Sequence, residues 1–160
     1  MSEPTEQSLV IGWRETVSLP HWGIENLAAK ADTGARSSAI DVENIEELPG
    51  NFVRFQVVRS RSRTDLSHPI EARIARRINV RSSFGHSMQR LTVFARIRIG
   101  TLEKVIEVGL VHRRRMITRM LLGRKALEHT FLVDSGRRYY YRKPAKKTGQ
   151  HRKKKPAEPA

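Results

Sequence analysis

The sequence predicts an all-β domain, either a closed barrel or a sandwich of short strands, with one short helix near its C-terminal end. Three observations lead to this fold class. Apolar and polar residues alternate with a period of two, short runs rich in β-branched and aromatic residues recur, and turn residues separate these runs. Helix-like sequence is confined to 124–129, directly after a glycine. Six or more short strands with so little helix form a barrel or a sandwich.

The strand signal is clearest in four segments in the middle of the chain. The first is β-branched and aromatic, two alternate in a clean period of two, and the last carries further β-forming residues. In order, they are 52–58, 70–74, 91–99 and 105–111. Turns are predicted at 49–50, 100–101 and 134–136, and the second has the spacing of a β-hairpin.

Length and composition bound the domain organisation. The 160 residues fit one domain, and the absence of cysteine excludes disulfides and thiolate chemistry. No apolar run approaches the length of a membrane span, and the N-terminal sequence is polar and acidic, unlike a secretory signal. We therefore expect a soluble cytoplasmic protein without a membrane partner.

The charge of the chain is strongly basic and is concentrated at its C-terminal end. The formal net charge is +15, and residues 142–160 contain eight basic side chains and one acidic one. With no large apolar residue, this tail is expected to be disordered, as are residues 1–8, which leaves 9–141 as the folded domain. Such a tail can contact RNA or the ribosome, and it is equally typical of a small protein that is basic for solubility.

One short motif carries chemistry. Asp32-Thr33-Gly34-Ala35 lies between two strand-like runs, which places the aspartate at a loop tip. The motif resembles the active-site loop of the retropepsin and pepsin clan. In that chemistry two carboxylates about 3 Å apart share one proton, so one can activate water while the other protonates a scissile carbonyl. Thr33 can brace an opposing loop, and the Gly34 N–H can bond the carboxylate. By itself, the same motif is also typical of an ordinary β-turn.

A second motif, Met120-Leu121-Leu122-Gly123-Arg124, joins an apolar run to the predicted helix. With its flanks, the chain resembles a prokaryotic retropepsin-like aspartic endopeptidase family often labelled ATP-dependent zinc proteases. Some members act with a glutamate ligase that adds glutamates to a ribosomal protein. The segments that carry the resemblance are 11–15, 19–20, 29–36, 120–124 and 131–134.

The resemblance implies a closed retropepsin-like acid-protease barrel over 9–141 with one short C-terminal helix. It implies an aspartic endopeptidase that hydrolyses peptide bonds and trims poly-glutamate extensions on an acidic or ribosomal protein. The site residues expected from it are catalytic Asp32, Thr33 and Gly34, substrate-binding Ala35 and Gly85, and the structural supports Gly123 and Arg124.

One Asp-Thr-Gly supplies one catalytic carboxylate where the mechanism uses two. Asp41, Asp65 and Asp134 lack the hydroxyl–glycine pair, so a symmetric homodimer is expected to contribute one copy of the motif from each subunit. Viral retropepsins carry an acid shortly after the motif that pairs with the Gly-Arg arginine. This chain has Arg-Ser-Ser at 36–38, so Arg124 needs another partner.

Asp134 and Glu15 are the two partners considered for that arginine. The segment 82–86, which contains Gly85, suits the mobile tip of a hairpin that covers a substrate, and is equally consistent with a plain surface turn. The six histidines are scattered and no phosphate-binding glycine-rich motif is present. We therefore expect no metal site and no cofactor, despite the label that the family carries.

A rival function of another class is a non-catalytic basic β-barrel adaptor that binds RNA or the ribosome. The arginine-rich strands and the basic tail favour it. The aromatic content of 6% argues against it, because stacking on bases needs exposed aromatic rings. A retropepsin-like fold that has lost activity is a third interpretation, against which the intact Asp-Thr-Gly-Ala argues.

Overall fold

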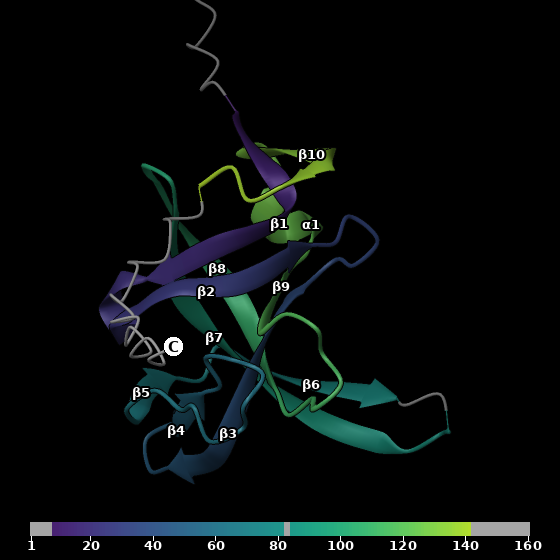
Figure 1. Ribbon diagram of the computed structural model, residues 1–160. Helices are drawn as coiled ribbons and strands as arrows, with labels where there is room; N and C mark the ends of the chain where they lie inside the picture. Colours follow the sequence, from purple (N-terminus) through teal and green to yellow (C-terminus); the bar gives the residue numbers. More distant parts are fainter. Residues whose placement is uncertain (1–7, 82–83, 142–160) are drawn as a thin grey trace, which may run out of the picture.

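The computed structural model describes residues 8–81 and 84–141, which form a β-barrel with a small sheet extension (Figure 1). The segments predicted to be disordered fall mainly on 1–7 and 142–160, outside the described residues. The elements are β1 (Leu9–Leu19), a 3₁₀ turn (Pro20–Trp22), β2 (Ile24–Ala31), β3 (Ser38–Leu48), β4 (Phe52–Val57), β5 (Ile70–Arg73), β6 (Arg76–Arg81), β7 (Ser87–Ile99), β8 (Leu102–Val111), β9 (Met120–Leu122), α1 (Arg124–Leu127) and β10 (Phe131–Arg138).

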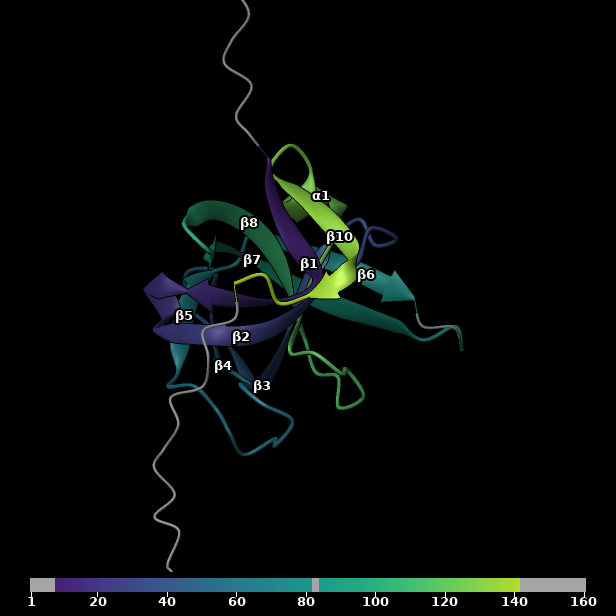
Figure 2. The same cartoon turned by 45° about the horizontal axis from the view of Figure 1, so that its top comes forward.

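The barrel is a closed ring of six strands, in the order β1-β2-β9-β3-β8-β7, which confirms the predicted fold class. Strand β7 returns to β1 through the pair Ser18–Arg98, and this pair closes the ring in the part of the chain that the structure describes. Strand β10 extends the sheet beside β1, β6 extends it beside β7, and β4 and β5 continue from β3 (Figures 1 and 2).

The alternating sequence folds as the period of two requires. Along β7, Val93, Ala95, Ile97 and Ile99 are buried, whereas Phe94 between them is exposed. Side chains of this inward-facing type fill the barrel from every strand of the ring. The burial of this apolar surface is the main force that stabilises the fold.

The turn predicted at 134–136 is wrong, because these residues lie inside β10. Parallel pairing of β10 with β1 runs from Leu9–Phe131 to Gly12–Asp134 and resumes at Arg14–Arg138. Two steps along β1 thus match four along β10. The turn-forming residues are absorbed as an irregularity of the ladder, which bends the strand without ending it.

The predicted helix is present but ends after one turn, at Leu127 instead of residue 129. Glu128 has left helical geometry, with φ −55° and ψ 140°, and His129 has a positive φ of 63°. Lys104 of β8 donates to the carbonyls of Ala126 and Glu128, at 2.9 and 3.1 Å. The helix is therefore attached to the barrel wall, and Lys104 of β8 caps its C-terminal end.

A buried carboxylate joins the first strand to the end of the described chain. Glu15 is 1% exposed. Its Oε2 accepts from the N–H groups of Gly12 and Tyr140, and its Oε1 from those of Thr16 and Tyr141, at 2.9–3.2 Å. A single side chain thereby accepts from two backbone N–H groups of β1 and from two that follow β10.

Replacing this carboxylate with its amide tests how much the junction stabilises the fold. Glu15→Gln places an NH₂ donor against backbone N–H donors in a buried site, so we expect the free energy of unfolding to fall by about 2–3 kcal/mol. Urea denaturation measures it. Glu103→Gln is the control, because the Glu103 side chain is 41% exposed. Equal losses in the two variants would show that burial of Glu15 has no special weight.

Candidate active site

The Asp-Thr-Gly-Ala segment lies where β2 leaves the barrel. Strand β9 pairs in parallel with β2 from Ala29–Met120 to Ala31–Leu122. The Asp32 N–H then donates to the Leu122 carbonyl at 2.8 Å, so the ladder continues one step beyond the strand. Asp32 is thus the first residue of the 32–37 loop. This loop and the β6–β7 hairpin project on the same side of the barrel (Figure 1).

The first residues of the loop fold back on the aspartate. The Gly34 N–H donates to Asp32 Oδ1 at 2.9 Å, and the Ala35 N–H to the Asp32 carbonyl at 3.3 Å. A Cβ at Gly34 would lie 3.1 Å from Oδ1, closer than an unstrained contact. Asp32 is half-buried, whereas Thr33 and Gly34 are exposed. The loop therefore fixes the direction of one carboxylate and leaves its neighbours accessible.

The segment from Gly123 to Lys125 supports this loop from below. The N–H groups of Arg124 and Lys125 donate to the carbonyls of Ala35 and Arg36, at 2.8 and 3.1 Å. Gly123 lies so close to the loop that a Cβ would come within 2.5–2.8 Å of the backbone of Ser37. Only glycine allows this approach, so the Gly-Arg pair and the Asp-Thr-Gly motif form one packed unit.

Neither acid considered for Arg124 is its partner. The guanidinium donates through Nη1 to the Thr33 carbonyl at 3.0 Å. Glu15 is occupied by the backbone groups described above, and Asp134 accepts from the Tyr140 hydroxyl. The prediction of an acidic partner is therefore wrong. Arg124 therefore bonds the loop directly, through the carbonyl of Thr33 between Asp32 and Gly34.

A methyl group at position 123 tests this packing. Gly123→Ala must displace the backbone of Ser37, so we expect a loss of about 1–3 kcal/mol in the free energy of unfolding. Gly136→Ala serves as the control, since its Cβ would meet Asp134 Oδ1 at an ordinary 3.4 Å. Thermal or urea unfolding compares them, and matching midpoints would contradict the close approach.

The two residues expected to bind substrate differ in their surroundings. Both backbone groups of Ala35 are used within the unit just described, so its contact with a substrate is left to its side chain. Gly85 is exposed at the end of the β6–β7 hairpin, with φ +80°, and a Cβ added there would meet nothing within 4 Å. Residues 82 and 83 lie outside the described part of the chain, and the covering role of the hairpin stays a prediction.

Sequence reasoning considered Asp41 only as a second catalytic aspartate, and the structure shows it fully buried on β3. Its carboxylate accepts from Arg119 Nη1 at 2.7 Å and Arg63 Nη1 at 2.5 Å. Arg63 also pairs with Glu43, whose second oxygen lies 3.1 Å from His112 Nδ1. This network joins β3 to the segments that follow β4 and β8. An aspartate in the apolar run 38–42 was the available signal for it.

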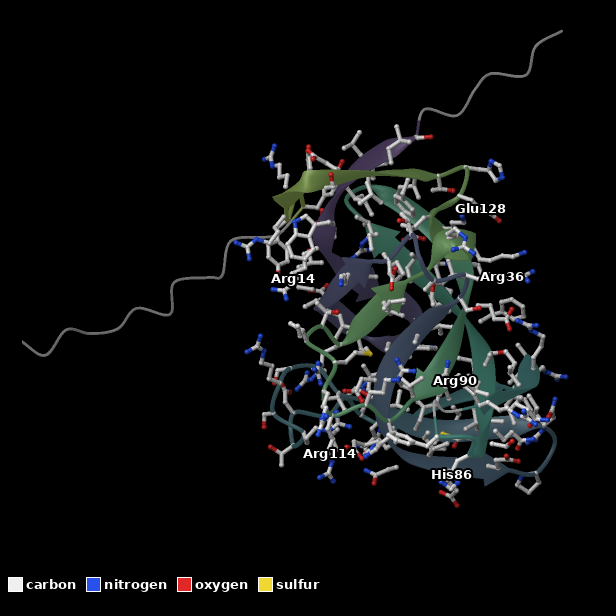
Figure 3. All side chains as sticks on the ribbon, turned by 90° about the vertical axis from the view of Figure 1, so that its right-hand side faces the viewer. Arg14, Arg36, His86, Arg90, Arg114 and Glu128 are labelled. Atoms are coloured by element: carbon white, nitrogen blue, oxygen red, sulfur yellow. The ribbon has the colours of Figure 1, made fainter. Side chains whose placement is uncertain are left out.

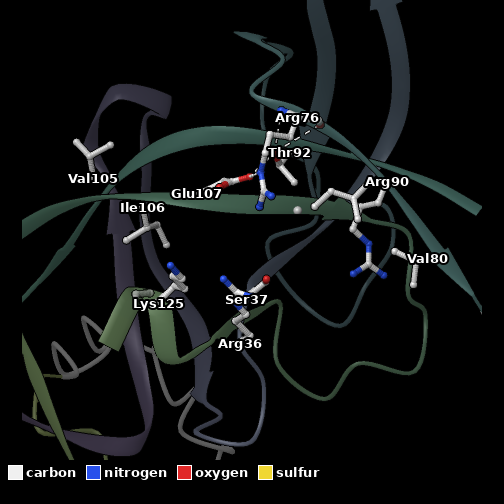
Figure 4. Close-up of a pocket in the computed structure, with 13 residues that line it drawn as sticks. Arg36, Ser37, Arg76, Val80, Arg90, Thr92, Val105, Ile106, Glu107 and Lys125 are labelled. Atoms are coloured by element: carbon white, nitrogen blue, oxygen red, sulfur yellow. Dashed lines mark hydrogen bonds and ion pairs between the residues drawn. The ribbon is translucent and has the colours of Figure 1, made fainter. Parts of the chain in front are cut away.

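A pocket of about 580 Å³ opens between the β6–β7 hairpin, β8, the end of the 32–37 loop and α1 (Figure 4). Four cationic side chains and one carboxylate line it, which leaves a net charge of three. They are Arg36, Arg76, Arg90, Lys125 and Glu107. No sequence pattern indicated the pocket, because its residues come from five separate segments that only the fold brings together.

The pocket's carboxylate is already satisfied. Glu107 accepts from Arg76 Nε at 2.6 Å and from the Thr92 hydroxyl at 2.7 Å. The hydrogen bond from Arg76 is the main cause that holds the pKa of Glu107 below its usual range, against the opposing effect of burial. The acid therefore stays charged at neutral pH and neutralises Arg76.

Neither a metal cluster nor a membrane-spanning helix is found in the described part of the chain. Within residues 8–81 and 84–141, no group of three or more histidine, aspartate or glutamate side chains is placed to hold a metal ion. In the same residues, no helix has the length and apolar character needed to cross a membrane.

Comparison with known proteins places the chain among retropepsin-like sequences. Residues 10–144 match the RimB-like family model, described as retropepsin-like aspartic endopeptidase RimB. This confirms the resemblance drawn from the motifs. A crystal structure of a Legionella pneumophila protein of unknown function superposes with a TM-score of 0.69 at 25% identity, over 84% of this chain and 98% of that one.

Curated relatives of the chain are named as ligases. Proteins named probable alpha-L-glutamate ligase from Shewanella pealeana and Desulfotalea psychrophila are each 30% identical, over 133 and 132 residues. These matches cover 81% and 78% of this chain but only 29% and 28% of the relatives. The chain thus spans less than a third of the length of these ligases.

Proposed function

Because the chain belongs to the RimB-like family of retropepsin-like aspartic endopeptidases, we propose that it hydrolyses peptide bonds with Asp32 as its catalytic carboxylate. The observation that carries the proposal is the geometry of the 32–37 loop. Asp32 is oriented by the Gly34 N–H and held at the end of a parallel ladder, and Arg124 and Gly123 fix the loop beneath it.

The second carboxylate comes from a second copy of the chain. Asp32 is only half-buried and Thr33 is exposed, so the loop tip is open to a symmetric partner. In the described part of the chain, the Thr33 hydroxyl has no hydrogen-bond partner. A two-fold axis through the loops would bring the two aspartates together and give each threonine the opposing loop to bond.

In the paired site, one carboxylate is ionised and the other is protonated, since two charges at this separation repel. The ionised group takes a proton from water, and the water oxygen bonds to the scissile carbonyl carbon. The protonated group donates to the carbonyl oxygen. Collapse of the tetrahedral intermediate then breaks the C–N bond, and the amine leaves with a proton returned by the first carboxyl group.

We assign acidic peptides, and poly-glutamate extensions in particular, as the substrate. Two observations support this choice: ligases named for glutamate contain a related segment, and a cationic pocket adjoins the catalytic loop. An extended peptide would lie between the loop and the β6–β7 hairpin. The basic residues assigned to contact with RNA or the ribosome lie in 142–160, outside the described residues, and that contact stays a prediction.

Loss of the titrating carboxyl group tests the catalytic assignment. Asp32→Asn keeps the shape and an acceptor for the Gly34 N–H, and we expect cleavage of a glutamate-tailed peptide to fall by at least about a thousandfold. Chromatography of the products over time measures it. Asp65→Asn is the matched control, on a surface aspartate paired with Arg59. Wild-type cleavage that survives in Asp32→Asn would rule out aspartic catalysis at this residue.

Mixing the two proteins tests the shared site. If each dimer needs both copies of Asp32, one part wild type exchanged with nine parts Asp32→Asn should lose roughly tenfold in activity per wild-type chain, because random pairing leaves few intact dimers. The same mixture made with Asp65→Asn should not. Unchanged activity per wild-type chain in the first mixture would mean that one subunit holds a complete site.

A further inference from the structure

The pocket beside the catalytic loop holds more cationic side chains than its one carboxylate can neutralise. Glu107 is used by Arg76 and Thr92. Among the described residues, the side chains of Arg36, Arg90 and Lys125 form no hydrogen bond or ion pair with a carboxylate. In Figure 4, Arg76 and Arg90 extend from the β6–β7 hairpin, and Arg36 and Lys125 lie across the pocket from them.

Arg90 is the most constrained of these cations. It is partly buried, and its pKa is lowered first by that burial and then by repulsion from Arg113. Its side chain lies along β8 at Gly109, where a Cβ would come within 2.9 Å of the Arg90 Cδ. The absence of a side chain at 109 therefore leaves the space that the Arg90 side chain occupies at the pocket wall.

The pocket is continuous with the catalytic unit. Arg36 and Ser37 follow Asp32 by four and five residues, and the Lys125 N–H donates to the Arg36 carbonyl. One wall of the pocket is therefore bonded to the loop that begins with Asp32. Arg36 and Arg90 lie on the face of the molecule seen in Figure 3.

The shape and composition of the walls indicate what group would fill the pocket. Besides the charges, the lining includes Ile78, Val80 and Val105, which can contact methylene groups. A volume of about 580 Å³ accommodates one long side chain together with water. An anionic head on a short aliphatic stem, as in glutamate, meets both requirements.

We propose that this pocket is a subsite for the side-chain carboxylate of one substrate residue, with Arg90 as the residue that selects it. The proposal rests on the peptidase function above, and it names the residues that recognise the acidic side chain of the substrate. Arg36 and Lys125 supply supporting positive charge from the opposite wall. The selection then applies to one position of the peptide and not to its total charge.

Position-by-position substitution of a hexaglutamate peptide tests this subsite. For the wild type, changing glutamate to glutamine at one position should lower kcat/KM by about tenfold or more, which is the expected loss of a charge-assisted hydrogen bond. In Arg90→Gln, the penalty at that position should disappear while the penalties elsewhere persist. Arg90→Lys should retain part of it.

Arg98→Gln is the matched control, because it removes the same charge from the same strand outside the pocket. It should leave the position-specific penalty unchanged. If Arg90→Gln keeps the wild-type pattern of penalties, or if both variants lower every position alike, the subsite is overturned and the peptidase function stands. Thermal unfolding of each variant verifies that the fold is retained.

Measurements of peptide affinity distinguish a wrong subsite assignment from a wrong peptidase function. Calorimetry of the Asp32→Asn protein should show tighter binding of hexaglutamate than of hexaglutamine, and Arg90→Gln in that background should remove at least about tenfold of the difference. If the wild type cleaves neither peptide but still binds hexaglutamate more tightly than hexaglutamine, the peptidase function alone is overturned. An equal affinity for the two peptides would overturn the subsite.

Discussion

The three-residue strand β9 determines the arrangement of the candidate site. It lies between β2 and β3, in parallel with the first and antiparallel to the second, and it links these two strands within the ring. Its last carbonyl receives the Asp32 N–H, and the next residue, Gly123, passes under Ser37. The position of the aspartate is therefore set by backbone pairing from a segment about 90 residues away, which a loop sequence alone cannot provide.

Charged side chains in the barrel interior and around the pocket are arranged in opposite ways. Buried carboxylates such as Asp41 and Glu15 are fully bonded within the chain and connect segments distant in sequence. Around the pocket the pattern is reversed, because cations outnumber acids and Arg90 is kept beside Arg113 despite the repulsion. A protein that arranged its charges only for stability would place a carboxylate there. The excess is consistent with an acid supplied by a substrate.

Features with local causes could be predicted from the sequence. Period-two alternation located the strands, and Asp-Thr-Gly indicated a loop between two of them. Features that depend on long-range contact could not. The carbonyl of Thr33 has no sequence signature as a partner for Arg124, and the glycine at 109 acquires its meaning only beside Arg90. The error at Asp134 has a similar cause, because turn-forming residues were absorbed by pairing with β1, which lies far earlier in the chain.

The closure of the ring through Ser18 and Arg98 has a consequence for its dynamics. This seam lies opposite β9 in the strand order, with β1 and β2 on one path and β7, β8 and β3 on the other. A barrel joined by so short a ladder can open locally between β1 and β7, while the strands on the far side of the ring stay paired. Amide protons near the β1–β7 pair are thus the ones most exposed to solvent by such opening. The Asp32 loop, which is bonded to β9, lies where the opening disturbs the barrel least.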